Sequence, residues 1–375
     1  MSQQDMDVDV ELTPRQQVPT VLAVGAQVFT VVAALAVGAV ALWAIDVNPL
    51  VAYDRMLIDT VSTPFQLTRT LNRAAPLILA GLAVYLPLKA GIENIGAEGQ
   101  IYLGGIVAVW VALNANIPGA LLLPAIFVAG FAGGAVWAVV PAYMAAKWEV
   151  NEILTTLMLV FVAIQVNEFL INGPMQGGIG AYPRSDQIPD AAVLLEFAGT
   201  DVNIGILLAV AATVFVYLLL NVTRTGYEFV LLGSNPDAAR QAGVNAFRKS
   251  LLILPLGAAF AGLAGMVEIA GNQGQLGSHW SPGYGWTAIP IALLGRRGAF
   301  QTMLAGLFFA VLFVGGSSLG VSMGIPAAIS DVIEALVILF LIAAEFIRSY
   351  RIDVKVDGES VGSSIRQLFA TGGGA

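Results

Sequence analysis

Long uncharged segments dominate this chain and leave little choice of fold. Residues 19–45 contain no charged side chain, and this run exceeds the roughly 20 residues that a helix needs to cross a bilayer. Similar apolar runs recur along the sequence, and only 11% of all residues are charged. Soluble domains carry roughly 25% charged residues. The sequence therefore predicts an all-α, polytopic membrane protein.

The distribution of basic residues sets the number and direction of the helices. About ten transmembrane helices with both termini in the cytoplasm place most Lys and Arg residues on the cytoplasmic side, as the positive-inside bias requires. Nine or eleven segments would move half of these charges to the wrong side. On this count, the outer loops hold only Arg55, Arg69, Arg73 and Arg184.

The same count divides the chain into three regions. We expect residues 1–17 to form a disordered acidic cytoplasmic tail and residues 18–347 to form the transmembrane domain. Residues 348–375 are expected to be a polar cytoplasmic tail. Within the transmembrane domain, residues 223–250 are predicted to be a cytoplasmic loop. Residues 172–203 are predicted to be a long outer loop of the kind that carries function.

Several chemistries are excluded by the residues that the chain lacks. It has no cysteine, which rules out disulfides and thiolate metal sites. Its single histidine, His279, supplies no set of imidazole ligands for a metal. None of the four lysines lies in a G-x-x-x-x-G-K-[ST] motif. We therefore expect no enzyme and no cofactor in this chain; ATP and magnesium, if used, would bind a partner chain.

A polar interruption from Arg224 to Gly265 is predicted to contain a short capped helix. Asn235 can accept the first free backbone N–H groups, and Pro236 suits the first helical position. Asp237 favours the positive end of the helix dipole, and Gly243 suits a left-handed residue after the helix. This two-turn helix is too short to span a membrane. It is expected to be either a docking element for a soluble partner or an ordinary solvated loop helix.

The run GSNPDAARQAGVN, followed by the Gly/Ala-rich stretch LPLGAAFAGLAG, resembles the coupling segment of importer-type ABC permeases. These permeases form the branched-chain amino acid, ribose and nucleoside superfamily. In that family, the short helix fits a cleft on the ATP-hydrolysing subunit. The resemblance favours docking. It implies ATPase-coupling roles for Asn235, Pro236, Asp237, Ala238, Ala239, Arg240 and Gly243.

Two apolar runs, Ala74–Leu88 and Ile101–Ala115, are about fifteen residues each, which is shorter than the roughly 20 needed to cross. Such short segments are typical of broken helices that line a transport pathway. NIGAEGQ, between them, resembles the signature of the nucleoside and simple-sugar branch of these permeases. We therefore expect Asn94, Glu98 and Gln100 in the substrate pathway; the alternative is a solvated cytoplasmic turn.

A second motif opens the helix that follows Asn151. NEILTTLML resembles the family's NEV-I-x-TLMLNY motif and places Glu152 among the predicted pathway residues. The match breaks at Val160 and Phe161, where Asn and Tyr are usual in the family. The exact solute is therefore open. A later short segment, from Gly285 to Gly295, is interrupted by Pro290 and hints at an inverted repeat.

Acidic residues inside predicted spans are functional candidates, because charge in a membrane is costly. These acids are Glu168, Glu268, Asp331 and Glu334, and no Lys or Arg is expected inside a span to pair with them. Glu268 with Asn272, one turn later, is the best candidate to bind sugar hydroxyls. The alternative is that the acids lie at outer helix ends and are solvated. The aromatic residues Trp280, Tyr284 and Trp286 could stack on a base or form an interfacial belt.

The resemblance covers about residues 71–343 and implies a multi-pass subunit of the plasma membrane. It implies an ATP-driven importer for nucleosides or related simple sugars, working by alternating access. Expected partners are ATP-binding cassette subunits, a second, distinct permease, an extracellular solute-binding lipoprotein and membrane lipid, but no nucleic acid. The alternative is an ion-coupled secondary carrier or channel that uses Asp331, Glu334 or Glu268.

Overall fold

A computed structural model describes residues 8–14, 32–33, 35–40, 42–177, 182–324, 350–356 and 359–360, with a few isolated positions between 328 and 343. The chain divides into two units, residues 1–47 with 331–375, and residues 48–330. The predicted first span at 19–45 and last span at 325–346 lie largely outside the described residues, as do Asp331 and Glu334.

The first unit contains a three-stranded antiparallel sheet. Strand β1 (Val8–Pro14) pairs with β2 (Tyr350–Val356), with Val8 opposite Val356 and Pro14 opposite Tyr350. Strand β2 also pairs with the short β3 (Glu359–Ser360). The sheet therefore joins a segment of the predicted amino-terminal tail to a segment of the predicted carboxy-terminal tail.

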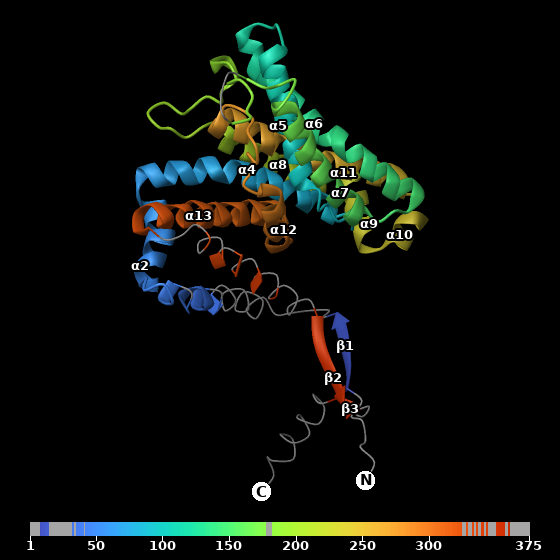
Figure 1. Cartoon of the computed structure of the whole chain (residues 1–375). Helices are drawn as coiled ribbons and strands as arrows, with labels where there is room; N and C mark the ends of the chain where they lie inside the picture. Colours follow the sequence, from blue (N-terminus) through green and yellow to red (C-terminus); the bar gives the residue numbers. More distant parts are fainter. Residues whose placement is uncertain are drawn as a thin grey trace. The chain divides into compact units, whose positions relative to one another are not determined.

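The second unit is built from helices (Figure 1). It begins with α2 (Pro49–Tyr53), the π-helical turn η1 (Asp54–Asp59), α3 (Thr60–Ser62), α4 (Pro64–Leu88), α5 (Ala97–Asn114), α6 (Gly119–Trp148) and α7 (Glu152–Ile171). After a loop with the 3-10 turn η2 (Asp190–Ala192) come α8 (Gly205–Val222), α9 (Arg224–Ser234), α10 (Pro236–Gln241), α11 (Ala246–Glu268), the π-helical turn η3 (Ile269–Gln273), α12 (Tyr284–Leu294) and α13 (Ala299–Met323).

Within the described residues, six helices are long and apolar enough to cross a membrane. These are Pro64–Leu88, Gly119–Trp148, Glu152–Ile171, Gly205–Val222, Ala246–Gln273 and Ala299–Gly320. The prediction of a polytopic helical membrane protein is therefore confirmed. The helix α12, with 11 residues, is short, as its sequence predicted.

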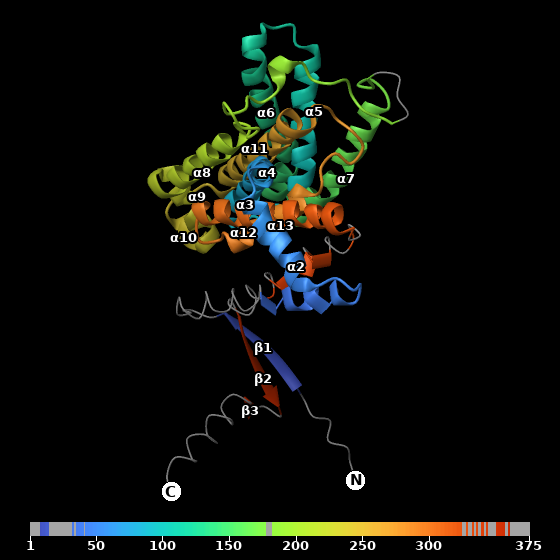
Figure 2. The same ribbon diagram turned by 90° about the vertical axis from the view of Figure 1, so that its left-hand side faces the viewer.

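Helices α4 and α11 form the centre of the second unit, and α7 and α8 lie on either side of them in Figure 2. Glycines allow the close packing. A Cβ atom on Gly104 of α5 would lie 2.2 Å from the Cα atom of Gly262 in α11. A Cβ on Gly134 of α6 would lie 2.2 Å from the carbonyl oxygen of Ala258. Small residues thus bring the helix backbones together.

The prediction of a short apolar segment at 74–88 is wrong about where the helix begins. Helix α4 begins ten residues earlier, at Pro64, and its 25 residues reach about 38 Å at 1.5 Å per residue. The polar residues 66–73, which were expected in an outer loop, form its first turns. Figure 1 shows α4 alongside α13, whose Ser318 hydroxyl accepts a hydrogen bond of 2.9 Å from Gln66. This packing stabilises a polar turn that hydropathy alone does not identify as helix.

Candidate functional site

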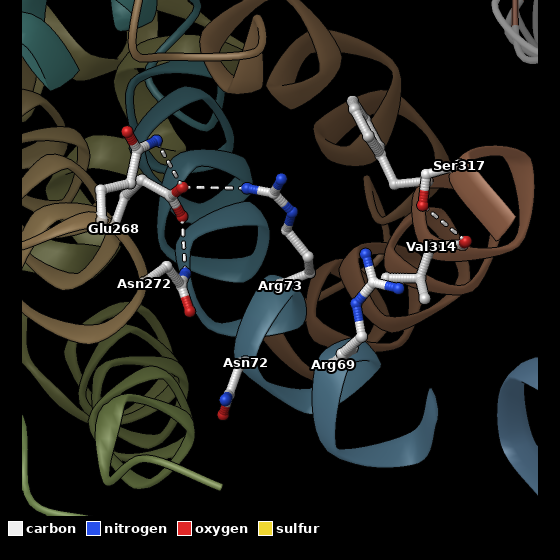
Figure 3. Close-up of a pocket in the computed structure, with 9 residues that line it drawn as sticks. Arg69, Asn72, Arg73, Glu268, Asn272, Val314 and Ser317 are labelled. Atoms are coloured by element: carbon white, nitrogen blue, oxygen red, sulfur yellow. Dashed lines mark hydrogen bonds and ion pairs between the residues drawn. The ribbon is translucent and has the colours of Figure 1, made fainter. Parts of the chain in front are cut away.

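A polar cavity of about 350 Å³ lies between α4, the α11–η3 junction and α13. Figure 3 shows three of its side chains, Arg69, Asn72 and Arg73, coming from α4. Glu268 and Asn272 face them from the α11–η3 junction. The cavity is lined by Arg69, Asn72, Arg73, Glu268, Asn272, Gln273, Phe313, Val314 and Ser317.

Glu268 is the centre of a hydrogen-bond network in the wall of this cavity. Its side chain is buried, and Arg73 donates to its Oε1 atom at 2.9 Å. Gln273 donates to the same oxygen at 2.9 Å. Asn272 and the hydroxyl of Tyr284 donate to Oε2 at 2.7 and 3.0 Å. Four donors therefore satisfy this buried carboxylate, as a buried charge requires.

The π-helical turn η3 explains why two successive side chains reach Glu268. Asn272 and Gln273 follow Glu268 by four and five residues, and the wider π turn brings both onto one side of the helix end. Single π turns inside α-helices are common at functional sites. The predicted pairing of Glu268 with Asn272 is present in the structure, while a role in binding solute stays a prediction.

The expectation that no basic residue would pair with Glu268 is wrong. Arg73 lies in the third turn of α4, inside a helix that is long enough to span, and not in an outer loop. It also donates a short hydrogen bond to the hydroxyl of Tyr284, and its guanidinium lies 5.5 Å from the Tyr284 ring centroid. Tyr284 is therefore part of this cluster and neither part of an aromatic belt nor free to stack on a base.

Helix α12 is held at its buried amino end by two carboxylates. Tyr284, its first residue, contacts Glu268 of α11. Gly285, its second residue, donates its backbone N–H to Glu98 of α5 at 2.6 Å. Both carboxylates are buried, and an anion at a helix amino terminus is favoured by the free N–H groups and the helix dipole. This is the geometry of an interrupted helix with an amino end inside the protein.

The other predicted pathway residues lie apart from this cavity. Asn94 and Gln100 are buried and exchange two hydrogen bonds of 2.9 Å, so the solvated-turn alternative is wrong for them. Asn94 also accepts from the backbone of Gly96 at 3.2 Å and donates to the carbonyl of Ala83. Glu152 is half-buried in the first turn of α7. Asn94, Gln100 and Glu152 do not line the cavity.

A second polar contact joins α7 to the loop before α12. Ser278 donates to Glu168 at 2.7 Å, and Asn167 donates to the carbonyl of Gly277 at 3.1 Å. In the same loop, Trp280 is buried with its ring centroid 5.0 Å from that of Tyr102 in α5. The loop is therefore packed against α5 and α7, and Trp280 serves this packing.

The predicted capped helix is present as α10. The side chain of Asn235 accepts from the backbone of Ala238 at 3.0 Å, Pro236 is the first helical residue, and Gly243 has a φ of +79°. Asn245 caps α11 in the same way by accepting from Arg248. The helix and its caps are confirmed, while the ATPase-coupling role stays a prediction.

One residue of α10 has a different environment from the other predicted coupling residues. Ala239 is fully buried against its own chain, whereas Asn235, Pro236, Asp237, Arg240 and Gly243 are exposed and Ala238 is half-buried. Asp237 and Arg240 form an ion pair of 3.4 Å on the exposed face. Asp237 and Arg240 therefore lie on the exposed side of α10, whereas Ala239 packs against the rest of the chain.

Helix α9, which leads into α10, was not foreseen from the sequence. Glu228 in α9 forms ion pairs with Arg224 at 3.0 Å and with Lys249 of α11. The hydrogen bond from Lys249, followed by that from Arg224, lowers the pKa of Glu228. At the other end of α9, a Cβ on Gly233 would lie 2.4 Å from the carbonyl oxygen of Lys89. The helix thus connects α10 to the ends of α4 and α11.

Comparisons with known proteins identify clear relatives. The chain is 53% identical over 363 residues to the glucose ABC transporter permease protein TsgB13 of Haloferax volcanii, covering 94% of this chain and 96% of the relative. It is 30% identical over 321 residues to the nucleoside ABC transporter permease protein NupB of Lactococcus lactis, covering 83% and 88%. It is 26% identical over 262 residues to the putative glucose ABC transporter permease protein TsgC13 of Haloferax volcanii, covering 66% and 75%.

A family model described as branched-chain amino acid transport system / permease component matches residues 66–342. The match extends from α4 through α13 and includes the cavity, the interrupted helix α12 and the capped helix α10. Permeases of this kind have no ATPase domain, so the expectation that a partner chain binds ATP is confirmed. This chain is a multi-pass membrane subunit of an ABC transporter and belongs to the family of branched-chain amino acid transport system permease components.

Proposed function

We propose that this chain forms the membrane pathway of an ATP-driven importer for a simple sugar of the glucose type. The observation that carries the proposal is the 53% identity, over nearly the whole of both chains, to a glucose ABC transporter permease. The polar cavity supports it, because a sugar needs hydrogen-bond donors and acceptors in place of the water it leaves behind.

The chemistry of the cavity suggests which side chains meet the sugar. Both oxygens of Glu268 already accept hydrogen bonds, so its role is to hold Arg73 and Asn272 in place. Amides such as Asn72 and Asn272 both donate and accept, and Ser317 and the guanidinium of Arg69 add further donors. We assign solute contact to Asn272 and Arg73, with Glu268 as their positioning residue.

The buried polar residues away from the cavity have a supporting role in this proposal. Glu98 holds the amino end of α12, and Asn94 and Gln100 fix the turn between α4 and α5. Glu152 opens α7, whose Thr156 hydroxyl donates to its carbonyl at 2.7 Å. These residues set the position of α5, α7 and α12 beside the pathway without touching the sugar in this state.

We further propose ten membrane segments with both termini in the cytoplasm. The pairing of β1 with β2 supports this arrangement, because two strands can form hydrogen bonds only on the same side of a membrane. Termini on one side require an even number of crossings. The six long helices, α5, the short α12 and the apolar segments at 19–45 and 325–346 together give ten.

Coupling to ATP hydrolysis is proposed to occur through α10. ATPase subunits would contact its exposed Asp237 and Arg240, and closure of the ATPase dimer would push on α9, α11 and the end of α4. The requirement is that α10 binds two ATPase states with different free energies. A second permease, similar to TsgC13, and an extracellular solute-binding lipoprotein would complete the importer in the cell membrane.

A nucleoside is the second candidate solute, because a nucleoside permease is 30% identical over 83% of this chain. The ion-coupled carrier is no longer supported, since the chain belongs to a permease family and Glu268 is paired with Arg73. Asp331 and Glu334, the other acids of that alternative, lie outside the described residues.

Uptake by intact cells distinguishes the two solutes. Cells that lack this chain are complemented with the wild-type gene and supplied with radiolabelled glucose or guanosine at low concentration. Restored glucose uptake that unlabelled guanosine does not inhibit is the expected result. Restored guanosine uptake without glucose uptake would assign the importer to nucleosides.

A further inference from the structure

Arg69 brings into the polar cavity a positive charge that no acid of the lining balances. The lining contains three charged side chains, Arg69, Arg73 and Glu268, and Glu268 is paired with Arg73 at 2.9 Å. Within the described residues, the Arg69 guanidinium forms neither an ion pair nor a hydrogen bond. Its central carbon lies 5.9 Å from the centroid of the Phe65 ring. The charges of the lining therefore sum to one positive charge.

The helices around the cavity supply no second acid. Helix α4 has Arg69 and Arg73 as its only charged residues, and α13 has none. Glu268 is the only acid of α11 and η3, and its two oxygens already accept from four donors. Asp201, whose carbonyl accepts from Asn72, is exposed and forms no ion pair with either arginine. A positive charge that entered the cavity would therefore find no free carboxylate on these helices.

The position of Arg69 gives its charge an effect on the contents of the cavity. Arg69 lies one helical turn before Arg73, in a helix long enough to cross a membrane, and Figure 3 shows both side chains projecting from the same side of α4. The apolar side chains of Phe313 and Val314 line the cavity from α13. Low-dielectric walls focus the field of a charge, and an arginine in a membrane pathway repels cations.

We propose that Arg69 is a specificity-determining residue that makes the cavity accept neutral sugars and sugar acids and reject cationic amino sugars. This inference rests on the proposed function, since it takes the cavity as the place that the sugar occupies. The guanidinium can donate to the hydroxyls of a neutral sugar and, more strongly, to the carboxylate of a sugar acid. The ammonium group of an amino sugar meets the charges of Arg69 and Arg73 without an acid to offset them.

The test measures sugar binding to the purified complex of this chain with the second permease and the ATPase, without the solute-binding protein. Apparent dissociation constants for glucose, glucuronate and glucosamine come from the rise of the thermal midpoint with sugar concentration. The ionic strength is constant, and the mildly acidic pH keeps the glucosamine amine protonated and the glucuronate carboxylate ionised. Glucose is neutral, so its dissociation constant reports any change in cavity shape.

The variants are Arg69→Gln, Arg69→Glu and Arg69→Lys, of which the last keeps the charge. Arg184→Glu is the matched control, because Arg184 is exposed, does not line the cavity, and its reversal changes the net charge of the chain by the same amount as Arg69→Glu. The midpoint of each complex without sugar identifies a folding defect. The three substitutions of Arg69 thus separate its charge from its shape.

We expect the wild type to bind glucuronate at least about tenfold more tightly than glucosamine. Arg69→Lys and Arg184→Glu should keep this preference, Arg69→Gln should remove most of it, and Arg69→Glu should reverse it. The inference is overturned if the wild type has no such preference, if no sugar stabilises it, or if Arg69→Glu leaves the preference unchanged. Binding of glucuronate without binding of glucose would support charge selection by Arg69 and contradict glucose as the solute.

Discussion

Arg73 of α4 and Glu268 of α11 form an ion pair of 2.9 Å in the wall of the polar cavity. They are 195 residues apart in sequence, and the contact joins the two most buried long helices of the second unit. The side chain of Glu268 is 1% exposed and that of Arg73 is 36% exposed, so the carboxylate depends on its partners more than the guanidinium does. This asymmetry sets the first prediction.

Replacement of Arg73 should be costly because it leaves the buried Glu268 carboxylate without its cation. Breaking a buried ion pair from one side costs about 3–5 kcal/mol. We expect Arg73→Met to lower the thermal midpoint of the purified subunit and to abolish uptake. The double variant Arg73→Met with Glu268→Leu should recover part of the stability but none of the uptake. Equal stability of Arg73→Met and the double variant would show that the unpaired Glu268 carboxylate carries no such cost.

The Glu98–Gly285 contact leads to a packing prediction. A Cβ on Gly285 would lie 2.1 Å from the backbone nitrogen of Glu98, so Gly285→Ala forces α12 away from α5. Overpacking of this kind costs about 1–3 kcal/mol. Gly277→Ala is the control, since a Cβ there meets nothing within 4 Å. Thermal unfolding in detergent should show a lower midpoint for the first variant only; the same midpoint for both would refute the close approach.

Acid should weaken the connection between α9 and α11. The hydrogen bond from Lys249 lowers the pKa of Glu228 in the folded protein. The stabilisation from this carboxylate is therefore complete above the pKa of a glutamate in the unfolded chain, about 4.3. It disappears as the pH falls through the lower pKa of the folded state. We therefore expect Glu228→Gln to reduce the thermal midpoint by a constant amount from about pH 8 to pH 5. Below about pH 4 the difference should shrink. A difference that grows on acidification would contradict this sign.

Charge reversal on α10 tests the docking surface. Arg240→Glu and Asp237→Arg change exposed side chains without disturbing the buried Ala239. We expect each variant to insert normally but to retain the ATPase subunit at least tenfold less well on affinity purification. Arg184→Glu, a charge reversal at an exposed residue between α7 and α8, serves as the control. Full recovery of the ATPase with both α10 variants would remove the coupling role from this helix.

The capped helix α10 could be predicted from sequence because its determinants are local. Asn235, Pro236 and Gly243 act through their own backbone positions, and the structure has each in its expected place. Even so, the sequence did not indicate which side of α10 is buried, because Ala239 is covered by residues outside the helix. Its substitution by arginine, an obvious test from sequence, would disrupt packing before it affected docking.

The ion pair of the cavity could not be predicted because it depends on the start of α4. The polar stretch 66–73 resembles a loop by hydropathy, but as helix it forms hydrogen bonds with Ser318 of α13 and with Asp201 in the loop before α8. The pairing of Glu268 with Asn272 could be predicted from the sequence, because the two residues lie one turn apart along the chain. The sequence predicts only an aromatic role for Tyr284. The hydrogen bonds of its hydroxyl group could not be predicted, because the partners lie on the distant helices α4 and α11. Long-range polar contacts of this kind leave no pattern in a single sequence.

Transport by a purified system tests the central claim most directly. This chain, a second permease, the ATPase and the solute-binding protein are placed in vesicles, and entry of radiolabelled glucose is followed with ATP, with ADP, and with an ATPase that cannot hydrolyse. The account predicts glucose accumulation above the external concentration only with ATP and the active ATPase. Accumulation that continues without hydrolysis, driven by an ion gradient, would contradict it.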